Sequence, residues 1–179
     1  MPRMTQERDR LRDWILAEAH GGDWLSLWPA VVGARARLIE RLASFSEAQA
    51  RWRPPSGEGE AAWSAAEVAA HVAAYSRNVG AIIEATAAGK TATKDRPGTV
   101  GPATNRPFAQ LVRLVTEESV RLASLPQRLP AEPDLETTVP HAFFGPLNCR
   151  GWYVFLRIHD LDHTRQLERL REAAGFPNG

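Results

Sequence analysis

An all-α fold is the class that this sequence predicts, and three observations predict it. Five stretches carry apolar residues at intervals of three and four positions, the spacing that places side chains on one face of a helix. Residues that favour helix starts precede these stretches, and segments with glycine or proline separate them. With 179 residues, 44% of them hydrophobic, the chain is long enough for one domain with a sizeable core.

The first two predicted helices follow each other closely. Thr5 is suited to cap a first helix, which ends at the glycines that begin with Gly21. Asp23 then caps a second, longer helix whose apolar face continues to Phe45. The charged residues of this second helix fall largely on its opposite face, so we expect that face to be solvated.

The third predicted helix has the clearest start signal. Ser64 and Glu67 match a capping box, in which each side chain bonds the backbone N–H of the other residue. The apolar face that follows includes His71, and the helix ends at Gly89. Residues 89–105 are polar and rich in turn formers, which predicts a connection from one end of a helix bundle to the other.

Two more helices complete the predicted fold. Asn105 caps a fourth helix that ends before Pro126, and Asn148 caps a fifth that ends at Gly175. The proline-rich segment 126–148 between them is too long for a plain link, and its aromatic and glycine residues argue against disorder. We expect this segment to pack over one end of the helices.

Composition excludes several classes of function. The formal net charge is +1 with no long basic run, so no nucleic-acid partner is expected. No apolar run approaches the roughly 20 residues that cross a bilayer, so no membrane span is expected. The hydrophilic start and the single Cys149 indicate a cytoplasmic protein without disulfides. We interpret residues 1–22 as an N-terminal helical extension and residues 23–179 as one domain.

The residues with the most distinctive chemistry lie close together near the C-terminus. His159 and His163 are four residues apart in a predicted helix, so both imidazoles can bind one metal ion. His71, on the apolar face of the third helix, is the expected third ligand. A buried histidine needs partners for both ring nitrogens, and one shared ion would satisfy all three residues. The alternative is that each histidine is a core residue bonded to a carbonyl or a carboxylate.

Three carboxylates accompany these histidines. Asp160 and Asp162 flank the pair, and Glu67 lies one turn before His71. Carboxylates in such positions often orient metal-bound imidazoles, although acidic residues beside an apolar face are also commonly solvated. The spacing is similar to the His-Glu-x-x-His of zinc proteases, but an aspartate replaces their glutamate and few residues follow for a further ligand.

A ligand pocket is expected beside the histidines, with Tyr75, His141 and Phe144 as its candidate residues. The alternatives are that Tyr75 packs in the core and that His141 is an exposed loop residue. Cys149 at a helix start is either a reactive thiol or a small apolar side chain. No side chain is assigned a catalytic role.

Together these stretches resemble the DinB/YfiT-like superfamily of metalloenzymes. The resemblance lies in Trp63–Val72, in His141–Leu147 and in His159–His163 with Gln166 beyond, and it covers roughly residues 28–172. It implies an up-down-down-up four-helix bundle, with the N-terminal helix as an addition. It also implies that His71, His159 and His163 are the metal ligands.

The resemblance also implies a chemistry. Characterised members of the superfamily use a divalent metal, often zinc or nickel, to activate a low-molecular-weight thiol such as bacillithiol or mycothiol. The expected function is therefore transfer of a thiol to a small electrophile, with a homodimer as a possible assembly. The alternatives are a metal-dependent hydrolase, with Asp160, Asp162 or Glu67 as general base, and a non-enzymatic metal- or ligand-binding stress protein with a closed site.

Overall fold

The computed structural model describes residues 2–55, 57–92 and 105–178. The long helices are α1 (Pro2–Gly21), α2 (Trp24–Ala43), α4 (Ala65–Ala87), α5 (Phe108–Ala123) and α7 (Cys149–Glu172). The short elements are α3 (Glu47–Arg51), the 3-10 helix η1 (Gly59–Ala62), α6 (Leu125–Arg128), β1 (Val139–His141) and β2 (Gly145–Leu147). The predicted all-α class is confirmed. Among the described helices, none is long and apolar enough to cross a membrane.

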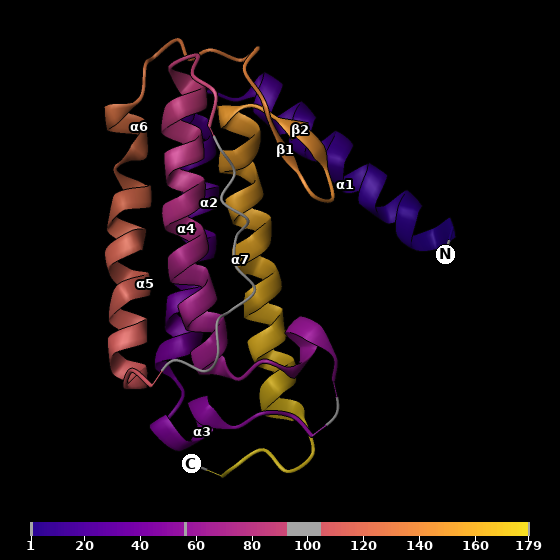
Figure 1. Ribbon diagram of the computed structural model, residues 1–179, viewed down its shortest axis with the longest axis vertical. Coiled ribbons are helices and arrows are strands. Elements are labelled where there is room, and N and C mark those ends of the chain that lie inside the picture. Colours follow the sequence, from indigo (N-terminus) through magenta and orange to yellow (C-terminus); the bar gives the residue numbers. More distant parts are fainter. Residues whose placement is uncertain (1, 56, 93–104, 179) are drawn as a thin grey trace.

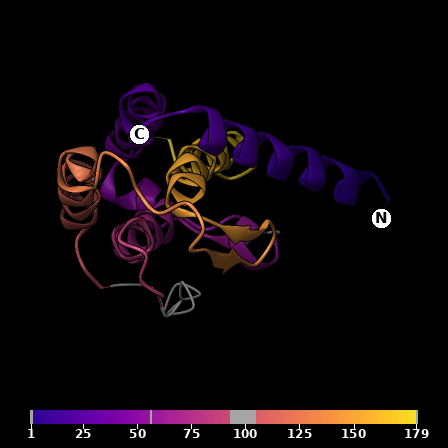
Figure 2. The same cartoon turned by 90° about the horizontal axis from the view of Figure 1, so that it is seen from above.

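Helices α2, α4, α5 and α7 form the bundle (Figures 1 and 2). The start of α5 lies beside α3, where the backbone N–H of Phe108 donates to Glu47. Arg41 of α2 pairs with Glu168 of α7, so the C-terminal ends of these two helices meet. The pair α2 and α7 therefore runs in one direction and the pair α4 and α5 in the other, which is the expected up-down-down-up order.

Helix α1 packs against α7 and extends beyond the bundle (Figure 2). Ile15 is fully buried and belongs to the same apolar cluster as Trp24 of α2 and Trp152 of α7. The guanidinium of Arg157 lies 5.3 Å from the ring centre of Trp14. The N-terminal extension is thus joined to the bundle by a buried apolar contact and a cation–π contact.

Two predicted helix starts are wrong. Helix α1 already begins at Pro2, so Thr5 lies inside it, and a proline in the first helical turn explains the earlier start. Helix α5 begins after Pro107 rather than after Asn105. The residue before the helix is Pro107, which has an extended backbone and makes no side-chain hydrogen bond to the helix start. A search for a polar capping residue therefore selects Asn105, which lies too early in the chain.

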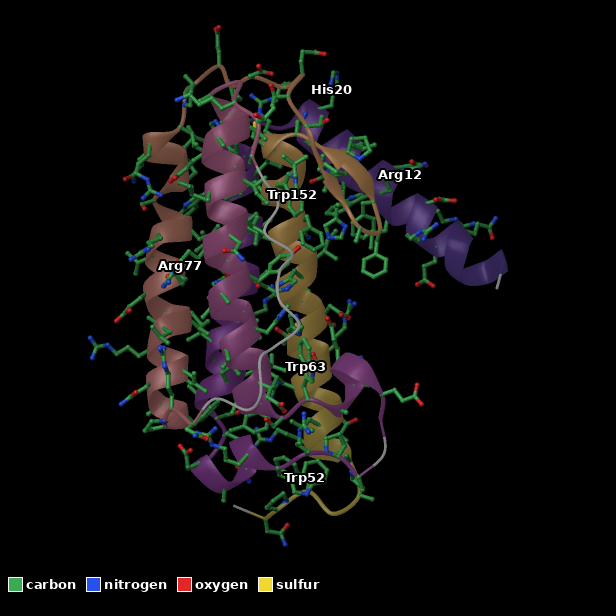
Figure 3. All side chains as sticks on the ribbon, viewed as in Figure 1. Arg12, His20, Trp52, Trp63, Arg77 and Trp152 are labelled. Atoms are coloured by element: carbon green, nitrogen blue, oxygen red, sulfur yellow. The ribbon has the colours of Figure 1, made fainter. Side chains whose placement is uncertain are left out.

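The segment 126–148 is more ordered than predicted. It starts within α6 and contains an antiparallel hairpin in which His141 pairs with Gly145. The hairpin lies beside the half of α7 that contains Trp152 (Figures 1 and 3). The predicted connection 89–105 falls largely on residues 93–104, outside the described residues.

A buried polar layer divides the core into two apolar clusters. The first includes Val31 of α2, Val79 of α4 and Leu156 of α7, and the second includes Leu38, Val72 and Leu167 of the same helices. Between the clusters lie Arg35, Ser76 and Asp160 together with the three histidines of the predicted site. In each helix that contributes to this layer, the buried face is therefore apolar, then polar for a short stretch, and then apolar again.

Candidate metal centre

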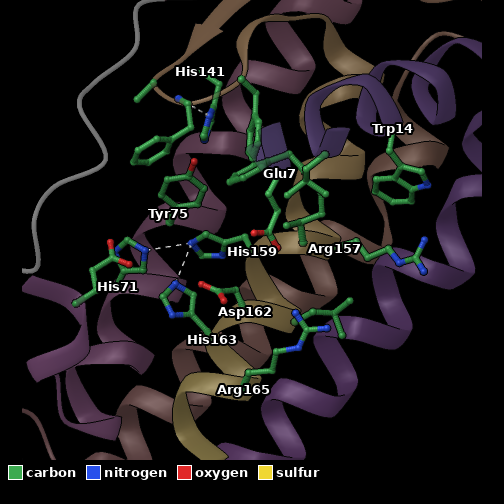
Figure 4. A pocket seen from close by; sticks show the side chains of 18 of the residues that line it. Glu7, Trp14, His71, Tyr75, His141, Arg157, His159, Asp162, His163 and Arg165 are labelled. Atoms are coloured by element: carbon green, nitrogen blue, oxygen red, sulfur yellow. Dashed lines mark hydrogen bonds between the residues drawn. The ribbon is translucent and has the colours of Figure 1, made fainter. Parts of the chain in front are cut away.

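Three imidazoles converge in the polar layer (Figure 4). His71 comes from α4, and His159 and His163 come from successive turns of α7. The Nε2 atom of His159 lies 3.1 Å from Nε2 of His71 and 3.2 Å from Nε2 of His163. One nitrogen from each ring lies within 4.8 Å of the other two. The structure thus brings together the three residues that the sequence predicts as ligands.

The spacing of these nitrogens suits one divalent cation. Zinc–nitrogen bonds of about 2.0–2.1 Å in tetrahedral geometry separate two ligand nitrogens by about 3.3 Å. The two short distances lie close to this value. A hydrogen bond between rings does not account for both contacts, because Nε2 of His159 carries either one proton or one lone pair. A cation shared by the three lone pairs accounts for both.

Gln166 fixes the orientation of His163. The Nδ1 atom of His163 lies 2.7 Å from the Oε1 atom of Gln166, and the Gln166 amide nitrogen donates to the backbone oxygen of Glu60. Since Oε1 only accepts, Nδ1 of His163 must carry the proton, and its Nε2 presents a lone pair to the cluster. The sequence analysis placed Gln166 within the resemblance but gave it no role.

Asp160 is fully buried and binds Arg35 of α2 through both carboxylate oxygens, at 2.7 and 2.9 Å. Arg35 also donates to the hydroxyl of Ser76, which donates in turn to the Val72 carbonyl. Burial alone would raise the pKa of Asp160, but the charge of Arg35 and the neighbouring His159 ring outweigh it and lower that pKa. Asp160 is therefore an ionised partner of Arg35.

His159 is held between the buried ion pair and the cavity. Its Nδ1 atom lies 3.6 Å from Oδ1 of Asp160, and Tyr75 stacks on its ring with a centroid distance of 4.3 Å. Burial lowers the pKa of His159 to about 4, against the opposing influence of Asp160. The ring is consequently neutral at pH 7, the form that binds metal ions.

The other two predicted carboxylates take different places. Glu67 accepts bonds from Arg53 and from the backbone and hydroxyl of Ser64, so it caps α4 instead of orienting His71. Burial opposes its charge, but these bonds lower the pKa of Glu67 overall. Asp162 is exposed and lines the cavity beside the histidines.

A cavity of about 1070 Å³ opens onto the imidazoles. The three predicted pocket residues, Tyr75, His141 and Phe144, all line it and are all buried. His141 packs against the rings of Phe144 and Phe155 at centroid distances of 4.9 and 4.3 Å, so its interpretation as an exposed loop residue is wrong. Burial raises the pKa of Tyr75 above its ordinary value, which keeps its hydroxyl protonated.

Part of the cavity wall comes from elements that sequence reasoning did not connect with the site. Glu7, Arg10, Leu11 and Trp14 of α1 line the cavity. Trp63 lies next to η1 (Figure 3) and packs against the ring of His71 with a centroid distance of 5.0 Å. Leu11 and Trp14 are three residues apart, a spacing that places both on one apolar face of a helix, but this pattern does not indicate which helix that face covers.

Cys149 is not part of the site. Its side chain is fully buried, and its Sγ donates to the backbone oxygen of Asp134. Burial raises the pKa of the Cys149 thiol to about 11, so the thiol is protonated at neutral pH. Of the two interpretations, the small apolar side chain is the one that the structure supports.

Fold and site together define a helical-bundle protein with a three-histidine cluster that could hold a metal ion and that faces a large cavity. The family model of the DinB superfamily matches residues 30–167, most of the chain. The chain belongs to the DinB superfamily. A search of curated proteins and a search of solved structures each gave no match. Helix α1 lies outside the matched range.

Proposed function

We propose that the protein binds a divalent metal ion, zinc or nickel, through His71, His159 and His163. The converging Nε2 atoms carry this proposal, because two of their separations suit a single tetrahedral ion. Gln166 supports it, because it leaves the Nε2 lone pair of His163 directed at the cluster. The lowered pKa of His159 supports it as well, because the neutral imidazole is the form that binds metal ions.

We further propose that the bound metal serves a thiol transferase. A divalent ion held by three neutral imidazoles keeps a position open and lowers the pKa of a coordinated thiol. The cavity beside the cluster gives room for a low-molecular-weight thiol, such as bacillithiol or mycothiol, and a small electrophile. Tyr75 and Phe155 pack against the ring of His159, and this apolar cover would limit the access of water to a bound thiol.

A hydrolase would require a general base in the cavity, and two of the three candidate carboxylates are bound to other side chains. Asp160 is bound by Arg35, and Glu67 is bound by Arg53 and Ser64. Of the three carboxylates that the sequence offered, only Asp162 lines the cavity. Hydrolysis that uses Asp162 is therefore the competing reaction that the assay must separate from thiol transfer.

The first experiment is elemental analysis of untagged protein prepared without a nickel column. One equivalent of a divalent metal in the parent and its loss in His159→Ala would support the site. His20→Ala is the matched control, because His20 is exposed at the end of α1 and should leave the metal content unchanged. Metal-free parent protein that gains neither metal nor thermal stability from added zinc would overturn the proposal.

The second experiment separates the two reactions. Consumption of chlorodinitrobenzene by the metal-loaded protein should require added thiol and should disappear in His159→Ala. Cleavage of a nitrophenyl ester without thiol, with loss of activity in Asp162→Asn, would instead identify a hydrolase. Metal binding without either activity would favour a non-enzymatic binding protein.

A further inference from the structure

Three arginines line one flank of the cavity. Arg10 comes from α1, and Arg157 and Arg165 come from α7. Among the described residues, no hydrogen bond or ion pair joins any of the three to a carboxylate. The guanidinium of Arg157 lies 5.3 Å from the centre of the Trp14 ring, and this cation–π contact does not neutralise its charge.

The three arginines line the part of the cavity that α1 and α7 form. Arg157, Leu161 and Arg165 succeed each other at four-residue intervals, so they form one row along α7, and all three line the cavity. Arg157 reaches the Trp14 ring on α1, the helix that also supplies Arg10. In Figure 4, Arg157 and Arg165 lie on the side of the cavity away from Tyr75.

The acidic residues of the same cavity do not cancel this flank once a metal is bound. Glu7, Glu60 and Asp162 also line the cavity. In Figure 4, Glu7 and Asp162 point toward the part of the cavity near His159. The charges of the three acids and the three arginines balance, so a divalent ion would leave the occupied cavity with two excess positive charges.

We infer that the flank formed by Arg10, Arg157 and Arg165 binds the anionic end of a ligand whose other end reaches the histidine cluster. Apolar side chains of the same wall, Leu11, Trp14 and Leu161, would cover an uncharged middle part. The ligand class is a carboxylate with an apolar chain and, at its far end, a thiol. The thiol rests on the thiol activation proposed above, whereas the anion site rests on the proposed metal alone.

The test compares thiols that differ only in their end group. Cobalt-loaded protein is titrated with mercaptohexanoate, mercaptohexanol and aminohexanethiol, and the thiolate-to-cobalt absorption band gives each Kd. The acid should bind tightest and the amine weakest. Gln in place of Arg10, Arg157 or Arg165 should weaken acid binding about two- to fivefold each, as expected for exposed ion pairs, and leave the alcohol unchanged.

Further variants test for stronger binding of the acid and for no change in its binding. Glu7→Gln removes a competing negative charge and should strengthen acid binding. Arg8→Gln on α1 and Arg169→Gln on α7 remove exposed arginines that do not line the cavity, so they should change nothing. Equal binding of acid and alcohol by the parent, or an unchanged ratio in the triple arginine variant, would overturn the inference.

A further titration makes failure of the anion site distinguishable from failure of the thiol proposal. If cobalt binds but no thiolate band forms, thiol activation is wrong, and the anion site is then measured by calorimetry with octanoate. Octanoate binding by the parent that is lost in the triple variant would sustain the inference. No binding, or equal binding by both proteins, would refute it.

Discussion

Gln166 determines which nitrogen of His163 faces the cavity. Its Oε1 accepts from Nδ1 at 2.7 Å, and its amide is held by the backbone of Glu60. Without this acceptor the His163 ring can rotate, or its proton can move from Nδ1 to Nε2, the nitrogen that faces the cluster. Gln166→Leu should therefore lower the metal affinity about 10- to 100-fold. Competition with a chromophoric chelator measures the change.

Two variants sharpen this experiment. Gln166→Glu keeps an oxygen acceptor and should retain most of the affinity. Gln110→Leu changes an exposed glutamine on α5 and should have no effect. An affinity in Gln166→Leu equal to that of the parent would show that the ring of His163 is oriented by its packing alone.

The sequence predicted the three histidines and proposed carboxylates to orient them, but it did not predict the arginines that bind Asp160 and Glu67. His159 and His163 are related by helical spacing, which is visible in any chain. The partners of Asp160 and Glu67 are Arg35 and Arg53, and those pairings arise only when separate segments fold together. Spacing thus identifies ligands on one helix, whereas orienting contacts between helices require the structure.

At the scale of elements, the Arg35–Asp160 pair joins α2 to α7 inside the core. Both side chains are almost fully buried, with exposed fractions of 1% and 0%. Asp160→Asn would leave the guanidinium without a counter-ion, so we expect a loss of about 3–5 kcal/mol in the free energy of unfolding. Urea unfolding of metal-free protein measures it and avoids stabilisation by the metal.

The exposed pair Arg41–Glu168 joins the same two helices and serves as control. Its side chains are 37% and 43% exposed, so Glu168→Gln should cost less than about 1 kcal/mol. Equal losses in the two variants would mean that burial adds nothing to the Arg35–Asp160 pair.

The same ion pair predicts the sign of a pH effect. Arg35 lowers the pKa of Asp160 in the folded chain below the ordinary aspartate value of 3.8. Its stabilisation is therefore fully present above that value and is lost as the pH falls through the lower folded pKa. Asp160→Asn should show a weaker decline of stability in this acid range than the parent.

Helices that begin with a clear capping residue were predicted correctly. The short strands, which form only through their pairing, were not. The caps Asp23, Ser64 and Asn148 all bond the start of their helices. The hairpin β1–β2 was missed because each strand has only three residues with a proline at its centre. Such strands carry no alternating pattern and are recognisable only from their pairing.

At the scale of the whole molecule, α1 should unfold together with the bundle. Ile15 is fully buried in the cluster that contains Trp24 and Trp152. Ile15→Ala should lower the free energy of unfolding by about 2–5 kcal/mol in a single transition. Helix signal at 222 nm and tryptophan fluorescence, followed during urea unfolding, should give the same midpoint.

Leu16→Ala, the neighbouring substitution, is the control. Leu16 is 41% exposed, so its truncation should cost clearly less than that of Ile15. Two separate transitions in the parent would show that residues 1–22 fold independently, as the predicted division of the chain allows.

The overall bundle was predictable because its four helices are amphipathic and the resemblance covers them. The shape of the cavity was not, since it depends on how α1 lies across α7. An apolar face indicates that a helix is covered, but the covering partner depends on all the surfaces that compete for it. Arg10 and Trp14 therefore became wall residues only in the folded molecule.

The position of α1 affects how ligand preference can change during the evolution of this protein. The three imidazoles belong to the matched bundle, whereas part of the cavity wall belongs to a helix outside the match. Substitutions in α1 can alter ligand choice without moving any metal ligand. Selection on substrate preference and selection on metal chemistry can thus act on different segments, and grafting another α1 onto this bundle is a direct route to redesigning its specificity.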